Sequence, residues 1–230
     1  MMHRSTFLLR RPSFSSLLHH GLRRQQCAFC DTRLRPAEHI EPPPIICPDC
    51  YHALPWGPEH GPSLGERAAF YYQPPISQWI PAGKSSRHLD KLQLLGELLA
   101  ERMARQLPRL PQAIVPVPLH PQRLRERGFN QSLELARPLA QRLGIPLLTR
   151  QVYRTRHTPD QKQLSAAERT RNLQGVFALT PAATRQLPYQ HLAVFDDVIT
   201  TGTTCASLRE LLLQQGTTLV DIWCCATTKQ

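Results

Sequence analysis

The sequence of 230 residues has no long hydrophobic run. A helix that crosses a membrane needs roughly 20 consecutive apolar residues, and the N-terminal region offers only Phe7-Leu8-Leu9. We therefore expect no membrane span and a cytoplasmic protein. With 41% hydrophobic residues and a mean hydropathy of -0.35, the chain is typical of globular proteins. Its length suits one α/β domain with a small appendage.

The first 26 residues contain no acidic residue. Neither the apolar core of a secretory signal nor a small-residue cleavage site is present there. We expect residues 1–26 to form a basic tail that is disordered or partly helical. A mitochondrial transit peptide remains an alternative, because such peptides are also rich in Arg and Ser and lack acids.

Acidic residues are few: 17 Asp and Glu stand against 28 Lys and Arg, which gives a net charge of +11. Lysine is scarce as well, since only four of the 28 basic residues are lysines. The planar fork of donors on arginine matches phosphate oxygens, so the surplus favours phosphorylated ligands or a nucleic-acid backbone. A basic surface without a specific ligand is the equal alternative.

Four of the seven cysteines form two pairs, Cys27-x2-Cys30 and Cys47-x2-Cys50, with sixteen residues between them. This spacing is typical of a zinc ribbon, which we place at residues 27–59. Four thiolates complete a tetrahedral site and leave no position for a catalytic water, so the zinc is expected to be structural. Two disulfides or a redox pair are the alternatives, but nothing indicates an oxidising compartment.

Residues 60–230 alternate between helical and strand-like patterns, which is typical of a parallel sheet with helices on both faces. The expected helices are 89–107, 131–143 and 203–214, and the expected strands are 113–118, 146–149, 191–195 and 218–225. The proline-rich stretch 42–81 and the basic stretch 119–130 are expected to be irregular, and 154–171 resists assignment. The remaining cysteines have no ligand spacing and are expected to be buried: Cys205, Cys224 and Cys225.

The most informative segment follows the strand that ends at Val194-Phe195. Asp196-Asp197 come next, and Thr200-Thr201-Gly202-Thr203-Thr204 then opens a helix. Small hydroxyl residues and a glycine at a helix N-terminus can direct backbone N–H groups at one phosphate. Vicinal sugar hydroxyls can donate to the two carboxylates. The segment has no lysine, so it is not a Walker A loop, and the dinucleotide fingerprint is also missing.

These residues resemble the ComF/GntX family of type I phosphoribosyltransferase-like proteins. The resemblance extends from about residue 27 to 226 through the cysteine pairs, Lys84, Pro116–Leu119, Arg127–Gln131, Arg156 with Gln161, Arg171-Asn172 and Gly175–Phe177. It implies a parallel sheet with a small hood and a site for phosphoribosyl pyrophosphate. Asp196 and Asp197 would bind the ribose 2- and 3-hydroxyls. The 5-phosphate would lie on Thr200, Thr201, Gly202, Thr203 and Thr204.

The same resemblance implies a pyrophosphate-binding loop after the first strand of the sheet. The residues concerned are Pro116, Val117, Pro118, Leu119 and His120, with Arg125, Arg127 and Lys84 as candidate cations. A magnesium ion held largely by substrate oxygens is also implied. The reaction implied is displacement at the anomeric carbon of the ribose, with pyrophosphate as the leaving group.

Two functions remain open. One is transfer of the phosphoribosyl group to an unidentified base or amine. The other is a binding module without turnover that acts in DNA uptake or the use of external DNA, with single-stranded DNA or a DNA-handling protein as partner. A general base would separate the two, and His157 is the one candidate, although an exposed loop histidine is the commoner role.

Overall fold

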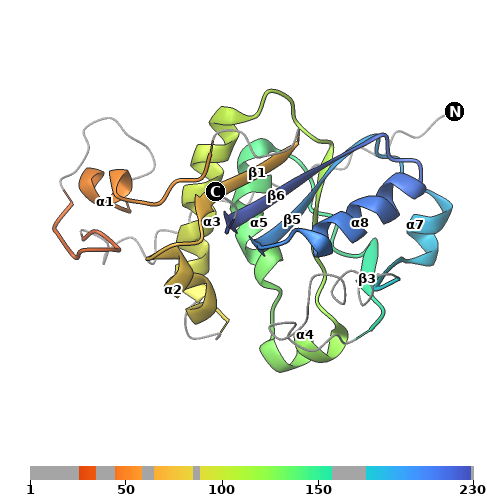
Figure 1. The fold of residues 1–230 in the computed structure, drawn as a ribbon, viewed down its shortest axis with the longest axis horizontal. Helices are drawn as coiled ribbons and strands as arrows, with labels where there is room; N and C mark the ends of the chain where they lie inside the picture. The colour runs from red at the N-terminus through yellow and green to blue at the C-terminus, as the bar shows by residue number, and fades with distance from the viewer. Residues whose placement is uncertain (1–25, 35–44, 59–64, 85–88, 157–174, 229–230) are drawn as a thin grey trace, which may run out of the picture. The chain divides into compact units, whose positions relative to one another are not determined.

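A computed structural model gives the fold, and it describes residues 26–34, 45–58, 65–84, 89–156 and 175–228 (Figure 1). The chain divides into two compact units, residues 1–54 and 55–230. Nearly all of the expected basic tail, residues 1–25, lies outside the described residues. In the first unit the described elements are an antiparallel bridge between Gln26 and Arg33 and the short helix α1, Pro48–His52.

The second unit is built on a four-stranded sheet in which every neighbouring pair of strands is parallel. The strand order is β1-β6-β5-β2, with β1 at Glu66–Tyr71, β6 at Leu219–Thr227, β5 at His191–Ile199 and β2 at Ala113–Pro116. The strand expected at 146–149 is reduced to a single parallel bridge between Leu147 and Ile114. Parallel strands need covering layers on both faces, and this sheet has them.

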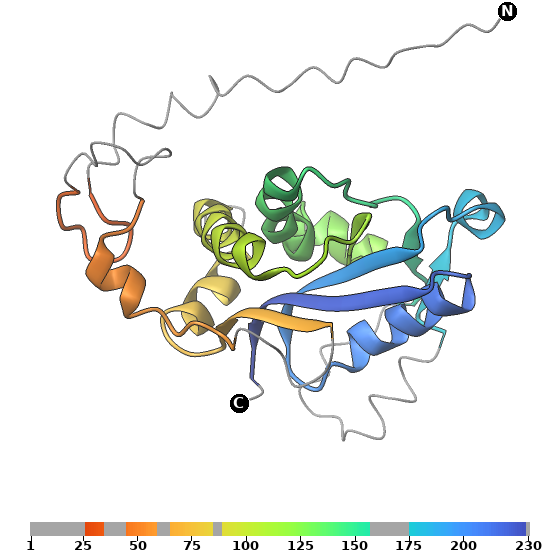
Figure 2. The same ribbon diagram turned by 90° about the horizontal axis from the view of Figure 1, so that it is seen from above.

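Three helices cover the sheet, as Figure 2 shows from the side. Helices α3 and α5 pack against each other on one face, and α8 covers the other. Their bounds are α3 Leu89–Gln106, α5 Gln131–Leu143 and α8 Thr203–Gln214, close to the three predicted helices. The predicted fold class, a parallel α/β sheet with helices on both faces, is confirmed.

The central strand β5 is apolar because both of its faces are buried. Leu192, Ala193, Val194 and Phe195 are fully shielded from solvent. Leu192 and Val194 belong to the cluster that packs under α8, whereas their neighbours alternate to the α3–α5 face. Cys205, Cys224 and Cys225 are buried, as predicted.

Two stretches expected to be irregular contain regular elements. The stretch 42–81 holds strand β1 and nearly all of helix α2, Ile76–Ala82. Strand β1 forms there because it completes the edge of the sheet beside β6. The stretch 119–130 holds helix α4, Pro121–Arg127. His120 caps its N-terminus, proline occupies its first turn, and Gly128 ends it in the left-handed conformation.

A small antiparallel hairpin lies outside the main sheet. It pairs β3, Val152–Arg154, with β4, Phe177–Leu179, and helix α7, Pro181–Arg185, follows. The segment between the two strands, residues 157–174, lies outside the described residues. His157, Gln161 and Arg171-Asn172 therefore have no described position.

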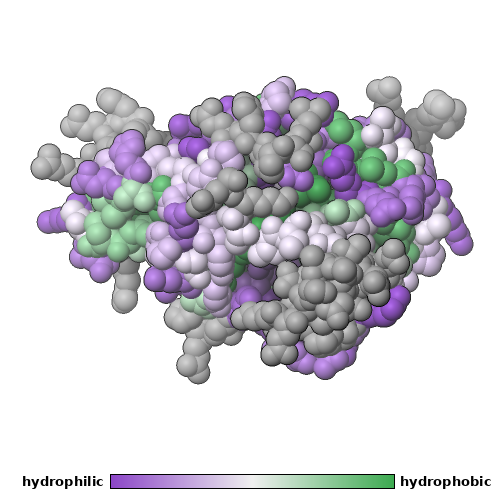
Figure 3. Space-filling model, in the orientation of Figure 1, coloured by the Kyte–Doolittle hydropathy of each residue, from purple (hydrophilic) through white to green (hydrophobic). Residues whose placement is uncertain are grey.

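The described helices include none that is both long and apolar enough to cross a membrane. On the face drawn in Figure 3, hydrophobic residues form separate patches on a surface that is otherwise mostly hydrophilic or neutral. The large apolar side chains exposed to solvent in the described ranges are Leu110, Leu124, Tyr153 and Leu213.

Candidate functional site

Asp196 and Asp197 lie on β5 just beyond the point where β5 stops pairing with β2. The pairing of β5 with β2 ends at Phe195 and Pro116, and the N–H of Val117 donates a last hydrogen bond to the Phe195 carbonyl (2.8 Å). On its other side β5 stays paired with β6 as far as Ile199. Strand β5 is therefore longer than the predicted 191–195. The two acids occupy the part of the strand whose β2 side is open.

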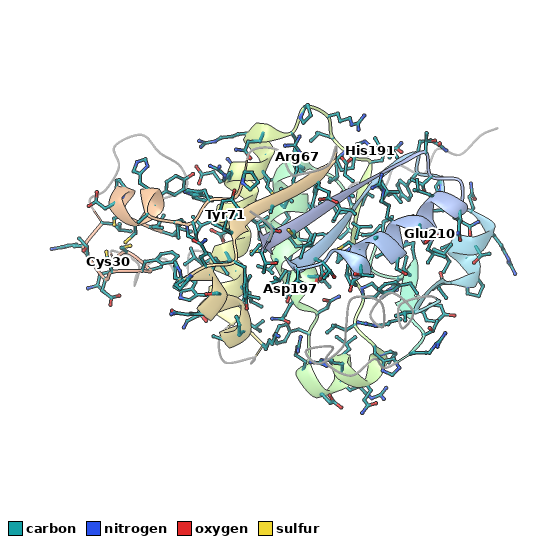
Figure 4. The ribbon with its side chains drawn as sticks, viewed as in Figure 1. Cys30, Arg67, Tyr71, His191, Asp197 and Glu210 are labelled. Carbon is teal, nitrogen blue, oxygen red and sulfur yellow. The ribbon has the colours of Figure 1, made fainter. Side chains whose placement is uncertain are left out.

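The carboxylate of Asp196 is held by neutral donors. The Ser132 hydroxyl on α5 donates to Oδ1 (2.9 Å), and the backbone N–H of Asp197 donates to the same oxygen (2.9 Å). The thiol of Cys205 on α8 is a weak and distant donor to Oδ2 (3.9 Å). Asp197 accepts a hydrogen bond from the backbone N–H of Val198 (2.8 Å). Figure 4 labels Asp197 near the end of β5.

Burial and the adjacent charge of Asp197, against the lowering effect of the Ser132 hydrogen bond, together raise the pKa of Asp196 to about 7. Burial also lowers the pKa of Arg154 on β3, which feels the opposite charge of Asp196 and the like charge of Arg123. Two adjacent carboxylates in a shielded position favour a ligand that brings hydroxyl donors or a cation.

The threonine loop forms the turn between β5 and α8. Gly202 stands immediately before α8 at a φ of 82°, a left-handed conformation that glycine adopts without strain. The hydroxyls of Thr201 and Thr203 lie 2.8 Å apart, and Thr200 and Thr201 are exposed. The loop thus places hydroxyl groups and the N-terminal N–H groups of α8 beside the two acids, an arrangement suited to an anion.

The loop after β2 is tied to the same place through the start of α5. Asn130 precedes α5 and donates from its side-chain amide to the Val117 carbonyl (2.9 Å). The side-chain oxygen Oδ1 of Asn130 accepts a hydrogen bond from the backbone N–H of Ser132 (3.1 Å). Ser132 is the residue whose hydroxyl donates to Asp196. Pro116 and Val117 are buried, whereas Pro118, Leu119 and His120 are partly exposed. A hydrogen-bonded chain thus joins the candidate pyrophosphate loop to Asp196.

The predicted cations lie at different places. Arg127 ends α4 and donates to the side chain of Gln131 (2.5 Å), which in turn donates to the Ile80 carbonyl (3.1 Å). Lys84 follows α2 and Arg125 lies on α4, and both side chains are exposed. Within the described residues neither makes a hydrogen bond or an ion pair. The structure thus ties Arg127 to α2 and α5 and leaves the other two facing solvent.

The four cysteines of the two pairs meet in the first unit. Their sulfur atoms all lie within 4.8 Å of one another, close enough to hold a metal ion such as zinc. Cys47 caps α1 and Cys50 lies in its first turn, so the second pair is presented by a helix N-terminus. Hydrogen bonds with Thr32 lower the pKa of Cys30 to about 6, which favours the thiolate that binds metals. Residues 35–44, between the two pairs, lie outside the described ranges.

Known proteins with similar sequences cover most of the chain. The DNA utilization protein YhgH of Salmonella typhi is 37% identical over 214 residues, which cover 89% of this chain and 86% of the relative. The protein of that name from Escherichia coli K12 is 42% identical over 165 residues, 68% of this chain and 69% of its own. Competence protein F of Haemophilus influenzae is 41% identical over 115 residues, 50% of each chain. The chain belongs to the ComF/GntX family. No family model matches the sequence.

Solved structures are more distant from this member of the ComF/GntX family. Hypoxanthine phosphoribosyl transferase of Trypanosoma cruzi has a TM-score of 0.32 and 11% identity over 59% of this chain and 62% of its own. An alanine mutant of an invariant aspartic acid in HPRTs has a TM-score of 0.35 and 12% identity over 59% and 67% of the two chains. These similarities are too low to support conclusions about substrate or mechanism.

The sequence analysis did not identify three residues at or near the candidate site. Ser132 and the hydrogen-bonding role of Asn130 were hidden because both residues read as an ordinary helix start, although an Asn before a helix is a capping signal. Arg154 fell in a stretch without a clear pattern. Its guanidinium lies over the Phe177 ring, 5.7 Å from the centroid, on the hairpin that neighbours the site.

Proposed function

We propose that the protein binds phosphoribosyl pyrophosphate with magnesium at the open end of β5. The observation that carries this proposal is the adjacency of two carboxylates and a threonine-rich helix start. Asp196 and Asp197 lie on the strand, and the Thr200–Thr204 loop follows within the same turn into α8. A sugar phosphate offers vicinal hydroxyls and a phosphate on one molecule.

The carboxylates suit the ribose ring because they accept hydrogen bonds and, within the described residues, have no cationic side chain in an ion pair with them. Asp196 keeps Oδ2 available except for the distant Cys205 thiol, and Asp197 is engaged by one backbone N–H. A charged acceptor makes stronger hydrogen bonds than a neutral one, especially where water is excluded. The 2- and 3-hydroxyls would therefore be bound by the two acids.

The 5-phosphate would lie against the turn before α8. Thr200, Thr201, Thr203 and Thr204 supply hydroxyls, and Gly202 leaves the backbone N–H groups accessible at a left-handed turn. The positive end of the helix dipole adds to the attraction. Nothing in this turn requires a base or a second phosphate, so the turn is suited to a terminal monophosphate.

The pyrophosphate group would lie toward the loop after β2. Pro116 to His120 form this loop, and Arg125, Arg127 and Lys84 are the candidate cations from the sequence. Magnesium, when bound, would neutralise charge on the pyrophosphate, held mainly by oxygens of the substrate itself. Arg154 is a further cation that feels Asp196 electrostatically.

If transfer occurs, the chain's own groups would stabilise a cationic ribose and a departing anion. Asp196 and Asp197 place negative charge near the sugar, and the arginines place positive charge near the leaving group. The bond between the anomeric carbon and the pyrophosphate oxygen would break as a base or amine forms its bond to that carbon. The acceptor is unidentified.

Calorimetric titration with phosphoribosyl pyrophosphate and magnesium tests the binding proposal. The double variant Asp196→Asn with Asp197→Asn should lower affinity by more than about 100-fold, because two charged hydrogen-bond acceptors are lost. Asp90→Asn, on an exposed position of α3, is the matched control and should bind as the parent does. Equal binding by the double variant, or none by the parent protein, would refute the proposal.

The second candidate is a binding module that handles nucleic acid without turnover. The names of the relatives, DNA utilization protein and competence protein F, and the net charge of +11 favour it. Release of pyrophosphate in the presence of a panel of bases and amines separates the two. Single-stranded DNA should bind with an affinity that falls steeply as salt rises if the arginines contact its backbone. An affinity that does not change with salt would count against DNA contact.

We also propose that the cysteine cluster holds one structural zinc ion. Metal analysis of the purified protein should give about one zinc per chain, lost in Cys30→Ser with Cys50→Ser and retained in Cys205→Ala, whose thiol lies outside the cluster. Zinc retained by the double Ser variant would refute this assignment. All seven cysteines are free, which suits a reducing compartment such as the cytoplasm.

A further inference from the structure

Among the residues that the structure describes, Ser132 is the one whose side chain makes a short hydrogen bond to Asp196. It lies in the first turn of α5, is 5% exposed, and donates its hydroxyl to Oδ1 at 2.9 Å. The other short bond to the same oxygen comes from the backbone N–H of Asp197. Of these two donors, only the serine hydroxyl belongs to a side chain and can be removed by substitution.

The position of this hydroxyl is fixed by its neighbours. Asn130 caps α5 by accepting from the Ser132 N–H (3.1 Å) and donates to the Val117 carbonyl (2.9 Å). Gln131, between them, is 3% exposed and donates to the Ile80 carbonyl. Asn130 is thus hydrogen-bonded to the loop after β2, and Gln131 to α2. The serine hydroxyl is held in place before any ligand arrives.

The other groups that face Asp196 do not replace this bond. Asp197 on β5 adds a like charge, and Cys205 on α8 is 3.9 Å away. Cys224 lies on β6 directly opposite Asp196, and burial raises the pKa of its thiol. Arg154 on β3 feels the charge of Asp196, and also that of Arg123 on α4, without a hydrogen bond to Asp196. Burial and Asp197 therefore oppose the charged carboxylate, whereas Ser132 favours it.

We propose that Ser132 is a positioning residue that favours the ionised form of Asp196 and orients it to accept a ligand hydroxyl. Only the part of this inference that concerns the ligand hydroxyl rests on the proposed function. The ionisation of Asp196 is a property of the free protein, and the ligand hydroxyl is the part that depends on phosphoribosyl pyrophosphate. Ser132 itself does not touch the ligand.

The expected effect has a defined direction. With Ser132 the pKa of Asp196 is about 7, so the carboxyl is ionised in about half of the molecules at neutral pH. Loss of one hydrogen bond to the charged form should raise that pKa by about one unit. The ionised fraction at pH 7 then falls about fivefold, and ligand affinity falls with it. At pH 9 both proteins are mostly ionised, so the difference should nearly vanish.

The experiment compares Ser132→Ala with Ser132→Thr, which keeps the hydroxyl, and with Ser77→Ala, which removes a half-buried hydroxyl from α2. Carboxyl carbon NMR of the full chain follows the Asp196 titration without ligand. Calorimetry with phosphoribosyl pyrophosphate and magnesium follows affinity from pH 6 to pH 9. Should the alanine variant not fold, Ser132→Cys supplies a weak donor of similar size and should give an intermediate pKa.

The proposal is supported if the alanine variant alone shows the raised pKa and a loss of affinity of about fivefold at pH 7 that disappears at pH 9. It is overturned if the Asp196 titration is unchanged in Ser132→Ala, or if Ser132→Thr behaves like alanine. A raised pKa in a protein that never binds phosphoribosyl pyrophosphate would uphold the role of Ser132 and refute the proposed ligand. The two failures are therefore distinguishable.

Discussion

Two carboxylates lie at opposite ends of the β5–β6 pair, and their surroundings differ: Asp221 is buried, whereas Asp196 is partly exposed. At the start of the strands, Asp221 on β6 lies 3.0 Å from His191 Nε2 on β5, and their side chains are 7% and 14% exposed. Near the end of β5, Asp196 is held by the Ser132 hydroxyl and a backbone N–H. Figure 4 labels His191 and Asp197 at opposite ends of the strand.

The difference lies in the groups beside each carboxylate. Asp221 Oδ2 lies 3.0 Å from the His191 imidazole, whereas its Oδ1 is buried without a hydrogen-bond partner among the described residues. Asp196 has neutral donors and a second carboxylate beside it, and no basic side chain of the described ranges forms an ion pair with it. A buried carboxylate without a countercharge is unfavourable and persists where it serves a ligand. We therefore predict that the His191–Asp221 end contributes to stability and that the Asp196 end serves ligand binding.

Removing the imidazole should give the largest effect on stability. His191→Ala leaves the buried Asp221 without its partner, and we expect the free energy of unfolding to fall by about 3 kcal/mol. Urea denaturation measures the change. Adding Asp221→Asn to this variant should recover part of the loss, because the uncompensated charge is gone. A loss below about 1 kcal/mol would show that the pair contributes little.

At Asp196, by contrast, removing the charge is expected to raise stability. Asp196→Asn removes a strained charge while its amide oxygen can still accept from Ser132, so stability at pH 8 should rise by about 1 kcal/mol. Affinity for phosphoribosyl pyrophosphate should nevertheless fall about 10- to 100-fold, because a charged acceptor is lost. Unfolding and calorimetric titration of the same sample test this opposition. A fall in both quantities would make Asp196 a structural residue.

The two ends should also differ in their response to pH. The pKa of Asp196 is raised from its ordinary value of 3.8 to about 7, so the native state binds more protons than the unfolded state between these values. The stability from this group is present below pH 4 and is lost as the pH rises through 7, by at most about 1.4 kcal/mol per pH unit. Asp196→Asn should lack this slope, whereas Asp221→Asn should keep it. Urea denaturation midpoints of the parent and both variants at several pH values test this difference.

Sequence reasoning predicted the parts of the fold whose pattern is local. The helix at 89–107, the helix ended by Gly144 and the threonine-loop helix were each found within a few residues, because apolar spacing and a glycine stop are written in the chain itself. Strand β1 was missed because its place at the sheet edge depends on β6, about 150 residues later. Such pairing leaves little local trace.

The same division holds for the site. The two acids, the threonine loop and the cysteine cluster were recognised from residues that are adjacent in sequence or regularly spaced. The hydrogen bond from Ser132 to Asp196 joins residues 64 positions apart, and a serine near a helix start gives no sign of it. That β5 continues through the acids was also hidden, because Asp-Asp is unfavourable in strands and reads as a strand end.

The smallest predicted effect separates backbone strain from ligand binding. Gly202, before α8, and Gly144, after α5, both have positive φ angles, 82° and 68°. An alanine at either position should lower stability by about 1 kcal/mol, because a side chain disfavours the left-handed region. Gly202→Ala should also weaken phosphoribosyl pyrophosphate binding about tenfold, since the turn presents the phosphate-binding N–H groups. Gly144→Ala is the matched control, because a Cβ there meets nothing within 4 Å and the turn lies at the far end of α5. Equal binding by both variants would mean that the phosphate does not lie on the threonine loop.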